Sequence, residues 1–557
     1  MSDKESLTGH TDAISPMHQK MELGGVLLLE GKTYGRHKGK LVYKCIPYEA
    51  QLPSFLIPYE DKSASGFSKI KINKYITFKY VDWQEKQPYG VVVNTFGKVD
   101  EINAYIEYQL HCQDLNHSLK QFNTKTMHVL REEAAFNLPK LFTEDYQIED
   151  RRSYPILSID PEHCKDIDDA LGIRKNAEGQ TILSIYIANV PLMIEHLYLW
   201  QVLSDRISTI YLPERKIPML PPSLSEFKCS LLEGEERVAF TLDVYIEKGN
   251  IVKYECKTCF IRVEKNYVYE ATELLARADY QELLKLVRHL NQESSRYLGY
   301  VEQVRDSHDV VEFCMILMNY ECAKILKKKG CGIFRSASKI KKAVVKYDTE
   351  AEEEAAAQAQ LEEEEAIRHL SPQLKYMIQG TSGEYCLAAD MKPHELIAGG
   401  LETYVHITSP IRRLVDCINM LEIMRDTYTF SQAANDFVEK WLAKIAELNK
   451  KTKAIRHLQN DILLLNMYEK SHIKDEMYIG VVIGAAPHRG SAPTTPFPTA
   501  SGSGGALYKY RVYIAQLKLL TNVYSAKKVD NYSTMYFTVH LFLDEAKMTK
   551  KVRLQMV

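Results

Sequence analysis

Hydrophobic positions near the start of the chain come in short runs that are separated by glycine, proline and charged residues. The runs at 26–29, 41–46, 55–57, 75–80 and 90–93 predict short β-strands, and the basic segment 31–40 predicts a hairpin connection between two of them. Many short strands with such turns are typical of small β-barrels. Basic and aromatic residues alternate along these strands, which suits nucleic-acid binding. Ordinary strand faces with solvated lysines are an equal alternative.

The pattern changes twice further along the chain. Residues 101–150 predict a helical and irregular bridge, and residues 151–470 mix strands with helices and become mainly helical from about 309. Apolar residues at helical spacing predict a long helix over 430–470, and the β pattern returns in 476–557 with strands at 481–483 and 510–514. Together these segments predict an α+β multidomain protein in which a mixed-sheet domain lies between small barrels.

Three segments have a biased composition. Residues 1–22 are polar and predict a disordered start, and residues 348–370 are rich in alanine and glutamate and predict a solvated helix or insert. Residues 485–506 are rich in proline, serine, threonine and glycine and predict a disordered loop within the last domain. The predicted organisation is therefore a barrel region at 23–100, a bridge at 101–150, a large domain at 151–470 and a second barrel at 476–557.

The totals exclude some classes and leave others open. The chain has 557 residues and a formal net charge of −2, from 71 basic and 73 acidic residues. The net charge therefore does not indicate a nucleic-acid partner. If the protein binds nucleic acid, its basic residues must line a local groove. No apolar run is long enough for a membrane span, no signal pattern opens the chain, and the 11 cysteines follow no disulfide spacing. We expect a cytoplasmic protein without a membrane partner.

One acidic stretch has the strongest chemical signal. The aspartates Asp160, Asp166, Asp168 and Asp169 fall within ten residues, directly after an apolar run that reads as a buried strand. Like charges repel and burial penalises each of them, so a hard divalent cation with oxygen ligands is the natural compensation. A solvated acidic turn is the plain alternative, and the apolar flank disfavours it. An EF-hand loop is excluded because its glycine and its closing glutamate are missing.

Three further stretches bear on function. The prolines around 210–221 stiffen a loop that presents Tyr211, and a helix over 312–319 carries Glu312. In the third stretch, Thr408-Ser409-Pro410 begins a helix with Arg412 and Arg413 in its first turn. Cations are disfavoured at a helix N-terminus, so arginines beside free backbone N–H groups indicate an anionic ligand, most simply phosphate.

These blocks, in this order, resemble the signature of the RNB family, which comprises ribonuclease II, ribonuclease R and the catalytic exosome subunit. The blocks are Asp160-Pro161 with Asp166 to Asp169, Tyr211-Leu-Pro with Pro-Met-Leu-Pro, and Thr408 to Arg413. The flanks are similar to the family's cold-shock-like and OB-type RNA-binding barrels, in the compact style of members from large DNA viruses. The resemblance implies a monomeric exoribonuclease that binds single-stranded RNA and hydrolyses it processively from the 3′ end to nucleoside 5′-monophosphates, with Mg²⁺, or Mn²⁺ as an alternative.

The resemblance also implies roles for individual residues. It makes Asp160, Asp166, Asp168 and Asp169 the metal-binding set, with Asp160 and Asp169 as direct ligands and Asp168 as the residue whose loss hurts chemistry most. It makes Tyr211 the residue that packs on the terminal nucleotide and Arg412 the contact to the scissile phosphate. The implied substrate-binding set contains Tyr211, Tyr269, Glu312, Arg412 and Arg413.

Several positions depart from the family pattern. Cys164 replaces an alanine, Asn189 an aspartate, Phe313 the second of two glutamates, Leu414 a tyrosine, Met420 a histidine and Gln459 a glutamate. None of these changes removes one of the four aspartates. They motivate a second hypothesis, a catalytically weakened RNB scaffold that binds RNA. A metal phosphatase for small substrates is a third reading, and it leaves the barrels unexplained.

Overall fold

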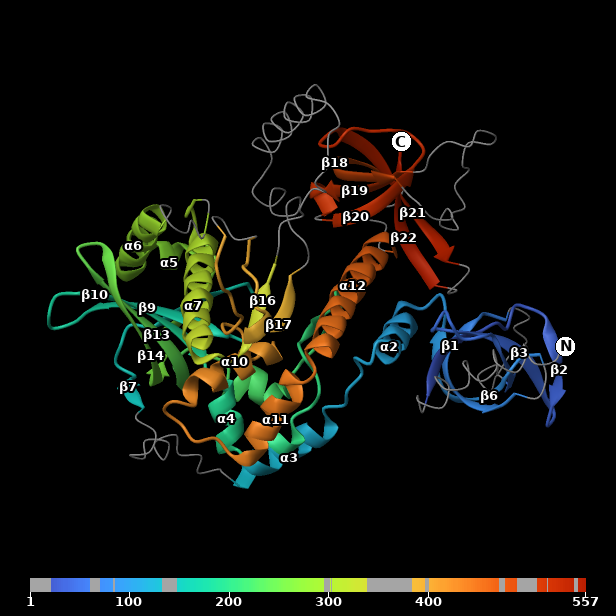
Figure 1. Cartoon of the computed structure of the whole chain (residues 1–557), viewed down its shortest axis with the longest axis horizontal. Helices are drawn as coiled ribbons and strands as arrows, with labels where there is room; N and C mark the ends of the chain where they lie inside the picture. Colours follow the sequence, from blue (N-terminus) through green and yellow to red (C-terminus); the bar gives the residue numbers. More distant parts are fainter. Residues whose placement is uncertain are drawn as a thin grey trace. The chain divides into compact units, whose positions relative to one another are not determined.

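The computed structural model describes residues 22–60, 71–83, 86–132, 148–294, 301, 303–337, 383–395, 400–469, 476–487, 508–517, 519–544 and 549–557. Two compact units are present (Figure 1): one spans 1–116, 212–215 and 453–557, and the other spans 117–211 and 216–452. The predictions for residues 1–21, 348–370 and 488–506 lie outside the described residues. No helix in the described part of the chain is long and apolar enough to cross a membrane.

The first sheet closes on itself. It contains β1 (Leu23–Leu27), β2 (Thr33–His37), β3 (Lys40–Pro47), β4 (Phe55–Tyr59), β5 (Lys74–Asp82) and β6 (Tyr89–Lys98) in the order β1-β5-β6-β4-β3-β2. Because β1 also pairs with β3, five of the strands form a barrel around Phe55 and Phe78. The predicted connection 31–40 is itself largely the exposed strand β2. Helix α2 (Ile102–Cys112) packs so close to β1 that a Cβ at Gly24 would collide with the Cys112 sulfur.

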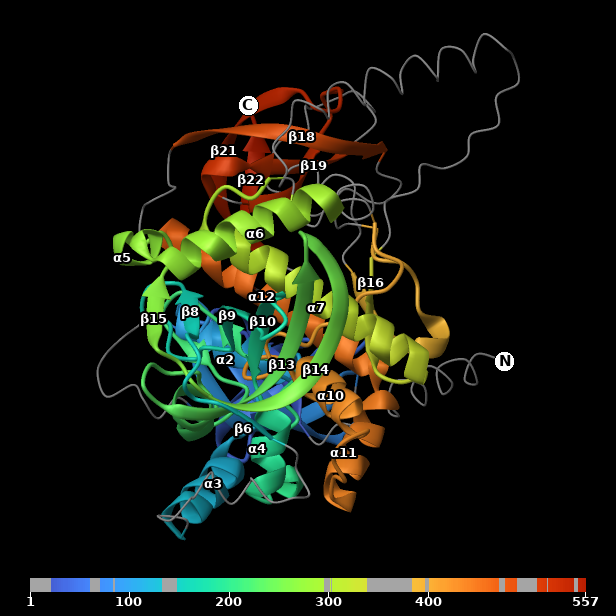
Figure 2. The same cartoon turned by 90° about the vertical axis from the view of Figure 1, so that its left-hand side faces the viewer.

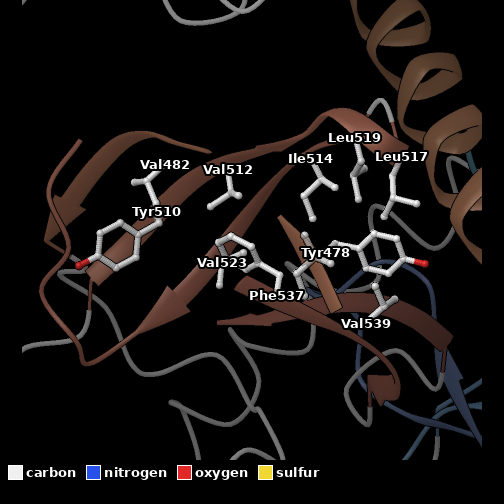
Figure 3. Close-up of a cluster of buried hydrophobic side chains, with 11 residues drawn as sticks. Tyr478, Val482, Tyr510, Val512, Ile514, Leu517, Leu519, Val523, Phe537 and Val539 are labelled. Atoms are coloured by element: carbon white, nitrogen blue, oxygen red, sulfur yellow. The ribbon is translucent and has the colours of Figure 1, made fainter. Parts of the chain in front are cut away.

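A second β domain ends the chain. Its strands are β18 (Met477–Pro487), β19 (Tyr508–Ile514), β20 (Leu519–Ser525), β21 (Thr534–Asp544) and β22 (Thr549–Met556), in the order β20-β19-β18-β21-β22. Alternate residues point inward, and Figure 3 shows Val512, Val523 and Phe537 meeting between the strands. A short 3₁₀ turn, η6 (Ala515–Leu517), joins β19 to β20. Strand β18 extends through 485–487, the first residues of the predicted loop.

The second unit is built on a seven-stranded sheet. Its strands are β7 (Glu149–Arg151), β8 (Leu157–Asp160), β9 (Asp169–Lys175), β10 (Thr181–Ala188), β13 (Glu236–Glu247), β14 (Asn250–Arg262) and β15 (Lys265–Val268), in the order β15-β8-β9-β10-β13-β14-β7. The edge pairs β15–β8 and β14–β7 are parallel and the others antiparallel. Helices α6 (Ala278–Ser294) and α7 (Ser307–Lys329) lie beside this sheet (Figure 2). The mixed sheet with helices and small barrels confirms the predicted α+β class.

Short elements complete the second unit. The helical ones are α3 (Lys120–Glu132), α4 (Val190–His196), η3 (Trp200–Val202), η4 (Ser223–Lys228), α5 (Thr272–Ala276), η5 (Ala388–Asp390) and α10 (Leu414–Met424). Two ribbons, β11 (Ile210–Tyr211) with β12 (Lys216–Ile217) and β16 (Ile333–Ser336) with β17 (Glu384–Leu387), are also present. The second ribbon lies within the region that was predicted to be mainly helical. The sequence did not predict it, because its two strands pair across a gap of about 50 positions and no local pattern reveals such a pairing.

The predicted long helix over 430–470 is two helices. Helix α11 (Gln432–Leu442) is capped at its N-terminus by Ser431, whose side chain accepts a hydrogen bond from the backbone N–H of Ala434. It ends at Ala443, and helix α12 (Ile445–Glu469) begins two residues later. The apolar spacing continues across this break, so periodicity alone could not locate it.

Candidate active site

The acidic stretch forms the connection between two neighbouring strands of the large sheet. Asp160 is the last residue of β8, Asp169 is the first residue of β9, and Asp166 and Asp168 lie in the loop between them. Strand β8 is buried from Leu157 to Ile159 because it lies inside the sheet. The fold therefore fixes both ends of the loop and brings all four aspartates to one end of the sheet.

Asp168 holds Arg412. The carboxylate of Asp168 is 3% exposed, and it accepts hydrogen bonds from Arg412 Nε at 3.1 Å and from the Ile411 backbone N–H at 2.9 Å. Burial raises the pKa of Asp168 to about 7, although Arg412 and the Ile411 N–H act in the opposite direction. The Arg412 side chain remains 46% exposed, so its outer N–H groups are accessible to a ligand.

Asp166 is engaged by a second pair of side chains. Its carboxylate accepts a hydrogen bond from the Tyr211 hydroxyl at 3.2 Å and pairs with Lys216 Nζ at 3.0 Å. Lys216 also pairs with Glu226 at 2.9 Å. Burial, followed by the negative charge of Asp166, raises the pKa of the Tyr211 phenol, so this hydroxyl stays protonated. Lys216 was not predicted, although it lies in the proline-rich stretch that drew attention to Tyr211.

Asp160 and Asp169 are left without an ion-pair partner among the described residues, whereas Asp166 and Asp168 each have one. One oxygen of Asp160, Oδ2, is buried and has no hydrogen-bond partner in the part of the chain that the structure describes. Burial raises the pKa of Asp160 to about 6, and burial with the charges of Asp160 and Asp168 raises that of Asp169. The charge of Arg412 lowers the pKa of both carboxyls, but burial outweighs it, so both pKa values remain raised.

The donor set suits a hard divalent cation. Across the described residues, no three His, Cys, Asp or Glu side chains are arranged to hold an ion on their own. Mg²⁺ does not need such a cage, because it is usually bound by one or two carboxylates and completes its coordination with water and substrate phosphates. The buried, unpartnered oxygen of Asp160 beside Asp169 provides such a pair. The residues present therefore fit Mg²⁺.

The sequence predicted Arg412 and Arg413 in the first turn of a helix, but the structure places both residues before the helix begins. Helix α10 begins at Leu414, and the backbone of Arg413 is extended because Ser208 and Arg413 form an isolated β-bridge. Arg413 Nη2 donates to Asp416 at 2.8 Å, and Asp416 also accepts a hydrogen bond from the Ser409 N–H. The segment is thus held by Asp416 and the bridge to Ser208, which leaves Arg412 pointing toward Asp168.

A pocket lies on the side of this segment where the two arginines and Tyr211 are accessible. Its volume is about 200 Å³. The lining combines the cations Arg412 and Arg413, the rings of Tyr211 and Tyr385, and apolar side chains that include Ile207 and Val415. Aromatic and apolar walls with a cationic side suit a base and its phosphate. Arg413 borders this pocket while it remains paired with Asp416.

Of the remaining two predicted residues, Tyr269 contacts the acidic loop, whereas Glu312 lies on helix α7. Tyr269 follows β15, its backbone N–H donates to the Asp160 carbonyl at 3.2 Å, and burial and then Asp169 and Asp160 raise the pKa of its phenol. Glu312 is exposed on α7, where its ionisable neighbours are Asp309, Asp306 and His308. The structure therefore brings Tyr269 to the acidic loop and places Glu312 one helical turn beyond His308.

Four of the family departures have structural roles in the second unit. Asn189 caps helix α4 by accepting a hydrogen bond from the Leu192 N–H at 3.1 Å. Phe313, Leu414 and Met420 are buried in the core. Cys164 is the exception, because it lies in the acidic loop, where burial and then Asp160 and Asp166 raise its pKa to about 12. Gln459 belongs to the other unit.

Residues 148–425, about half of the chain, match the family model of the RNB domain. The chain belongs to the RNB family, which confirms the resemblance drawn from the sequence motifs. It is 25% identical over 425 residues to ribonuclease R 2 of Lactococcus lactis, across 66% of this chain and 62% of that protein. It is also 28% identical over 314 residues to exoribonuclease 2 of Vibrio parahaemolyticus, across 48% of this chain and 47% of that protein.

Coverage differs among the relatives. Ribonuclease R of Thermotoga maritima is 30% identical over 187 residues, which are 33% of this chain and 26% of that protein. The chain thus spans between about a quarter and three fifths of the length of these curated relatives.

Two solved structures share the fold. RNase R of Mycoplasma genitalium, in complex with ribose methylated single-stranded RNA, superposes with a TM-score of 0.63 at 14% identity and covers 96% of this chain and 90% of its own. Yeast Ssd1, a pseudonuclease, gives a TM-score of 0.57 at 14% identity, with 90% of this chain and 65% of its own covered.

Proposed function

We propose that this protein is a Mg²⁺-dependent exoribonuclease that shortens single-stranded RNA processively from its 3′ end and releases nucleoside 5′-monophosphates. The observation that carries this proposal is the pair Asp160 and Asp169, which lies beside Arg412 without an ion-pair partner among the described residues. A protein that only binds RNA gains nothing from buried carboxylates that repel a phosphate. The sequence adds the expectation of a cytoplasmic monomer, and Mn²⁺ is the alternative ion.

Asp160 and Asp169 would hold the metal. When bound, Mg²⁺ supplies an activated water and neutralises charge on the phosphate. Asp166 and Asp168 would not bind the metal directly, because they already pair with Lys216 and Arg412. This arrangement supports the expectation from the family resemblance that Asp160 and Asp169 are the direct ligands, and it would give Asp166 and Asp168 the role of positioning Lys216 and Arg412.

Arg412 would bind the scissile phosphate. Asp168 fixes the Nε of Arg412 and Ser409 Oγ accepts a hydrogen bond from its Nη2 at 3.1 Å, so the guanidinium is oriented before any substrate arrives. A preorientated donor stabilises charge that develops on a phosphate without reorganisation at the moment of reaction. The exposed part of the group faces the ligand side, as its 46% exposure allows.

Tyr211 would position the last base. Its hydroxyl donates a hydrogen bond to Asp166, while the residue is 42% exposed and lines the pocket. Stacking of one base on an aromatic ring contributes roughly 1–3 kcal/mol and tolerates every base. The names of the relatives support the reaction class, since they are ribonuclease R and exoribonuclease 2.

The second hypothesis is an RNA-binding protein with weakened catalysis. The likeness to the pseudonuclease Ssd1 and the changes at Asn189, Phe313 and Gln459 favour it. Against it, Asn189 caps a helix and Phe313 fills the core, so neither change touches the four aspartates.

A digestion assay separates the two hypotheses. The protein is incubated with 5′-labelled oligo(A) and Mg²⁺, and shortening from the 3′ end gives a ladder of labelled products. We expect the ladder with the wild type and with Glu162→Gln, an exposed charge in the same loop, and none with Asp169→Asn. Tight binding without any ladder in the wild type would establish the weakened scaffold instead.

A further inference from the structure

Tyr269 and His308 form a close aromatic stack beside the acidic loop. Their ring centroids are 3.5 Å apart and the ring planes differ by 8°, so one face of each ring covers the other. Tyr269 is joined through its backbone to Asp160, and its phenol lies within the field of Asp160 and Asp169. The stack therefore lies next to the two carboxylates that form no ion pair within the described part of the chain.

Local hydrogen bonds fix the two rings in this register. Ser307 donates from both its N–H and its hydroxyl to Glu270 Oε1, at 2.7 and 2.6 Å, and the Glu270 N–H donates to the Ser307 hydroxyl at 3.0 Å. Asp306 then caps helix α7 by accepting a hydrogen bond from the Asp309 N–H. Glu270, which follows Tyr269, is thus hydrogen-bonded to Ser307, which precedes His308. These bonds hold the two rings in position.

The two rings differ in how much surface they offer. His308 is exposed, whereas Tyr269 is half-buried. Since Tyr269 covers one face of the imidazole at 3.5 Å, the exposed surface of His308 is its other face and edge. The face of Tyr269 that His308 covers has no room for a base. A base that continues the stack on this side would therefore lie on the free face of His308.

We propose that the outer face of the His308 imidazole is a stacking platform for one base of the RNA strand. This inference rests on the proposed function for the class of its ligand, a nucleobase in a single strand. Aromatic rings bind bases through their π-faces without sequence preference. Asp309 is buried and paired with Arg305 at 3.3 Å, which leaves the exposed Glu312 on the same helix and Asp306 at its N-cap to repel phosphate. The platform therefore takes the base rather than the backbone.

Equilibrium binding tests the platform without turnover. Fluorescence anisotropy is measured with labelled oligo(A) in EDTA, for the wild type, His308→Ala, His308→Phe and the control His289→Ala, an exposed histidine that contacts Gly249. We expect His308→Ala to bind about tenfold more weakly, because one stacked base contributes affinity of that order. His308→Phe keeps a ring and should bind like the wild type, as should His289→Ala.

A series of oligonucleotides, each with one abasic nucleotide near the 3′ end, then locates the contact. At one position the wild type should lose its advantage over His308→Ala, because the base that stacks is missing. Equal affinity of His308→Ala and wild type overturns the platform. So does a loss in His308→Ala that is the same at every abasic position or that His308→Phe shares. A wild type that cuts RNA without the abasic pattern disproves the platform alone, and one that binds no RNA disproves the proposed function.

Discussion

Arg412 Nε donates a hydrogen bond to Asp168 Oδ2 over 3.1 Å, which joins two residues that are 244 positions apart in the sequence. One partner comes from the loop that carries the aspartates and the other from the segment that precedes helix α10. This bond makes the carboxylate of Asp168 a support for the guanidinium rather than a free anion.

Substitution of Asp168 by Asn should lower kcat for RNA hydrolysis about 10²- to 10³-fold, the range seen when one preorganised electrostatic contact is lost. The amide removes the charge that fixes Arg412 Nε and leaves the Ile411 N–H bond available. Single-turnover degradation of labelled oligo(A) measures the rate, and the exposed Glu162→Gln is the control in the same loop. A wild-type rate in Asp168→Asn would contradict the assignment of Arg412.

Mg²⁺ should stabilise the wild type and leave Asp160→Asn almost unaffected. A bound ion would compensate the charges of Asp160 and Asp169, whose burial and mutual repulsion disfavour the metal-free fold. Without metal, Asp160→Asn should melt at a higher temperature than the wild type, since it removes one of the two charges. Differential scanning fluorimetry in EDTA and in a Mg²⁺ series tests both statements, and equal Mg²⁺ shifts in the two proteins would rule the site out.

The buried ion pair between Arg151 and Asp243 should be important for stability. Both side chains are fully buried and two hydrogen bonds join them, at 2.8 and 2.5 Å. Asp243→Asn removes the buried charge partner of Arg151 and leaves only Glu149, which is 33% exposed, to pair with the guanidinium. We therefore expect a loss of about 3–5 kcal/mol in the free energy of unfolding.

Urea denaturation measures this loss. Asp150→Asn is the matched control, because Asp150 pairs with Arg152 at the surface and exposed pairs contribute at most about 1 kcal/mol. A similar loss in both variants would show that burial of the Arg151 pair is not the cause.

Glu149 should give an acid-dependent contribution to stability. Burial would raise its pKa, but Arg151 and Lys257 lower it to about 2. A carboxylate whose folded pKa lies below its unfolded value stabilises the fold above the unfolded value, about 4.3, and this contribution is lost as the pH falls toward 2. The difference in melting temperature between wild type and Glu149→Gln should therefore be constant above pH 5 and shrink below it. A difference that is independent of pH would contradict the pKa.

Asn189→Asp restores the residue that the family pattern has at this position. Both side chains cap a helix through an acceptor oxygen, so we expect kcat to stay within about twofold and Asn189→Ala to lose about 1 kcal/mol of stability. Digestion of oligo(A) and thermal unfolding provide the two measurements. A large gain of activity in Asn189→Asp would support the weakened-scaffold hypothesis.

Short-range patterns predicted much of the fold. Alternation and turn residues located β1, β3, β4, β5 and β6 of the first β domain and β18 and β19 of the last, because these signals depend on neighbours in the sequence. They did not locate β2, β20, β21 or β22. The same reasoning missed the break at Ala443, because the apolar spacing continues through it. It also placed Arg412 and Arg413 inside helix α10, whereas Arg412 lies in a turn and the bridge to Ser208 holds Arg413 extended before the helix. A contact over about 200 residues has no local signature.

The sequence by itself determined that four aspartates follow a buried strand, and that an arginine pair and a proline-stiffened tyrosine accompany them. Charge repulsion between close neighbours in the chain is enough to predict a cation there. The family resemblance already pointed to Asp160 and Asp169 as the direct ligands, and only the tertiary structure decided which basic side chains engage the other two aspartates. Arg412 and Lys216 come from distant segments and engage Asp168 and Asp166, which leaves Asp160 and Asp169. Ion pairs depend on separation in space, and folding sets that separation.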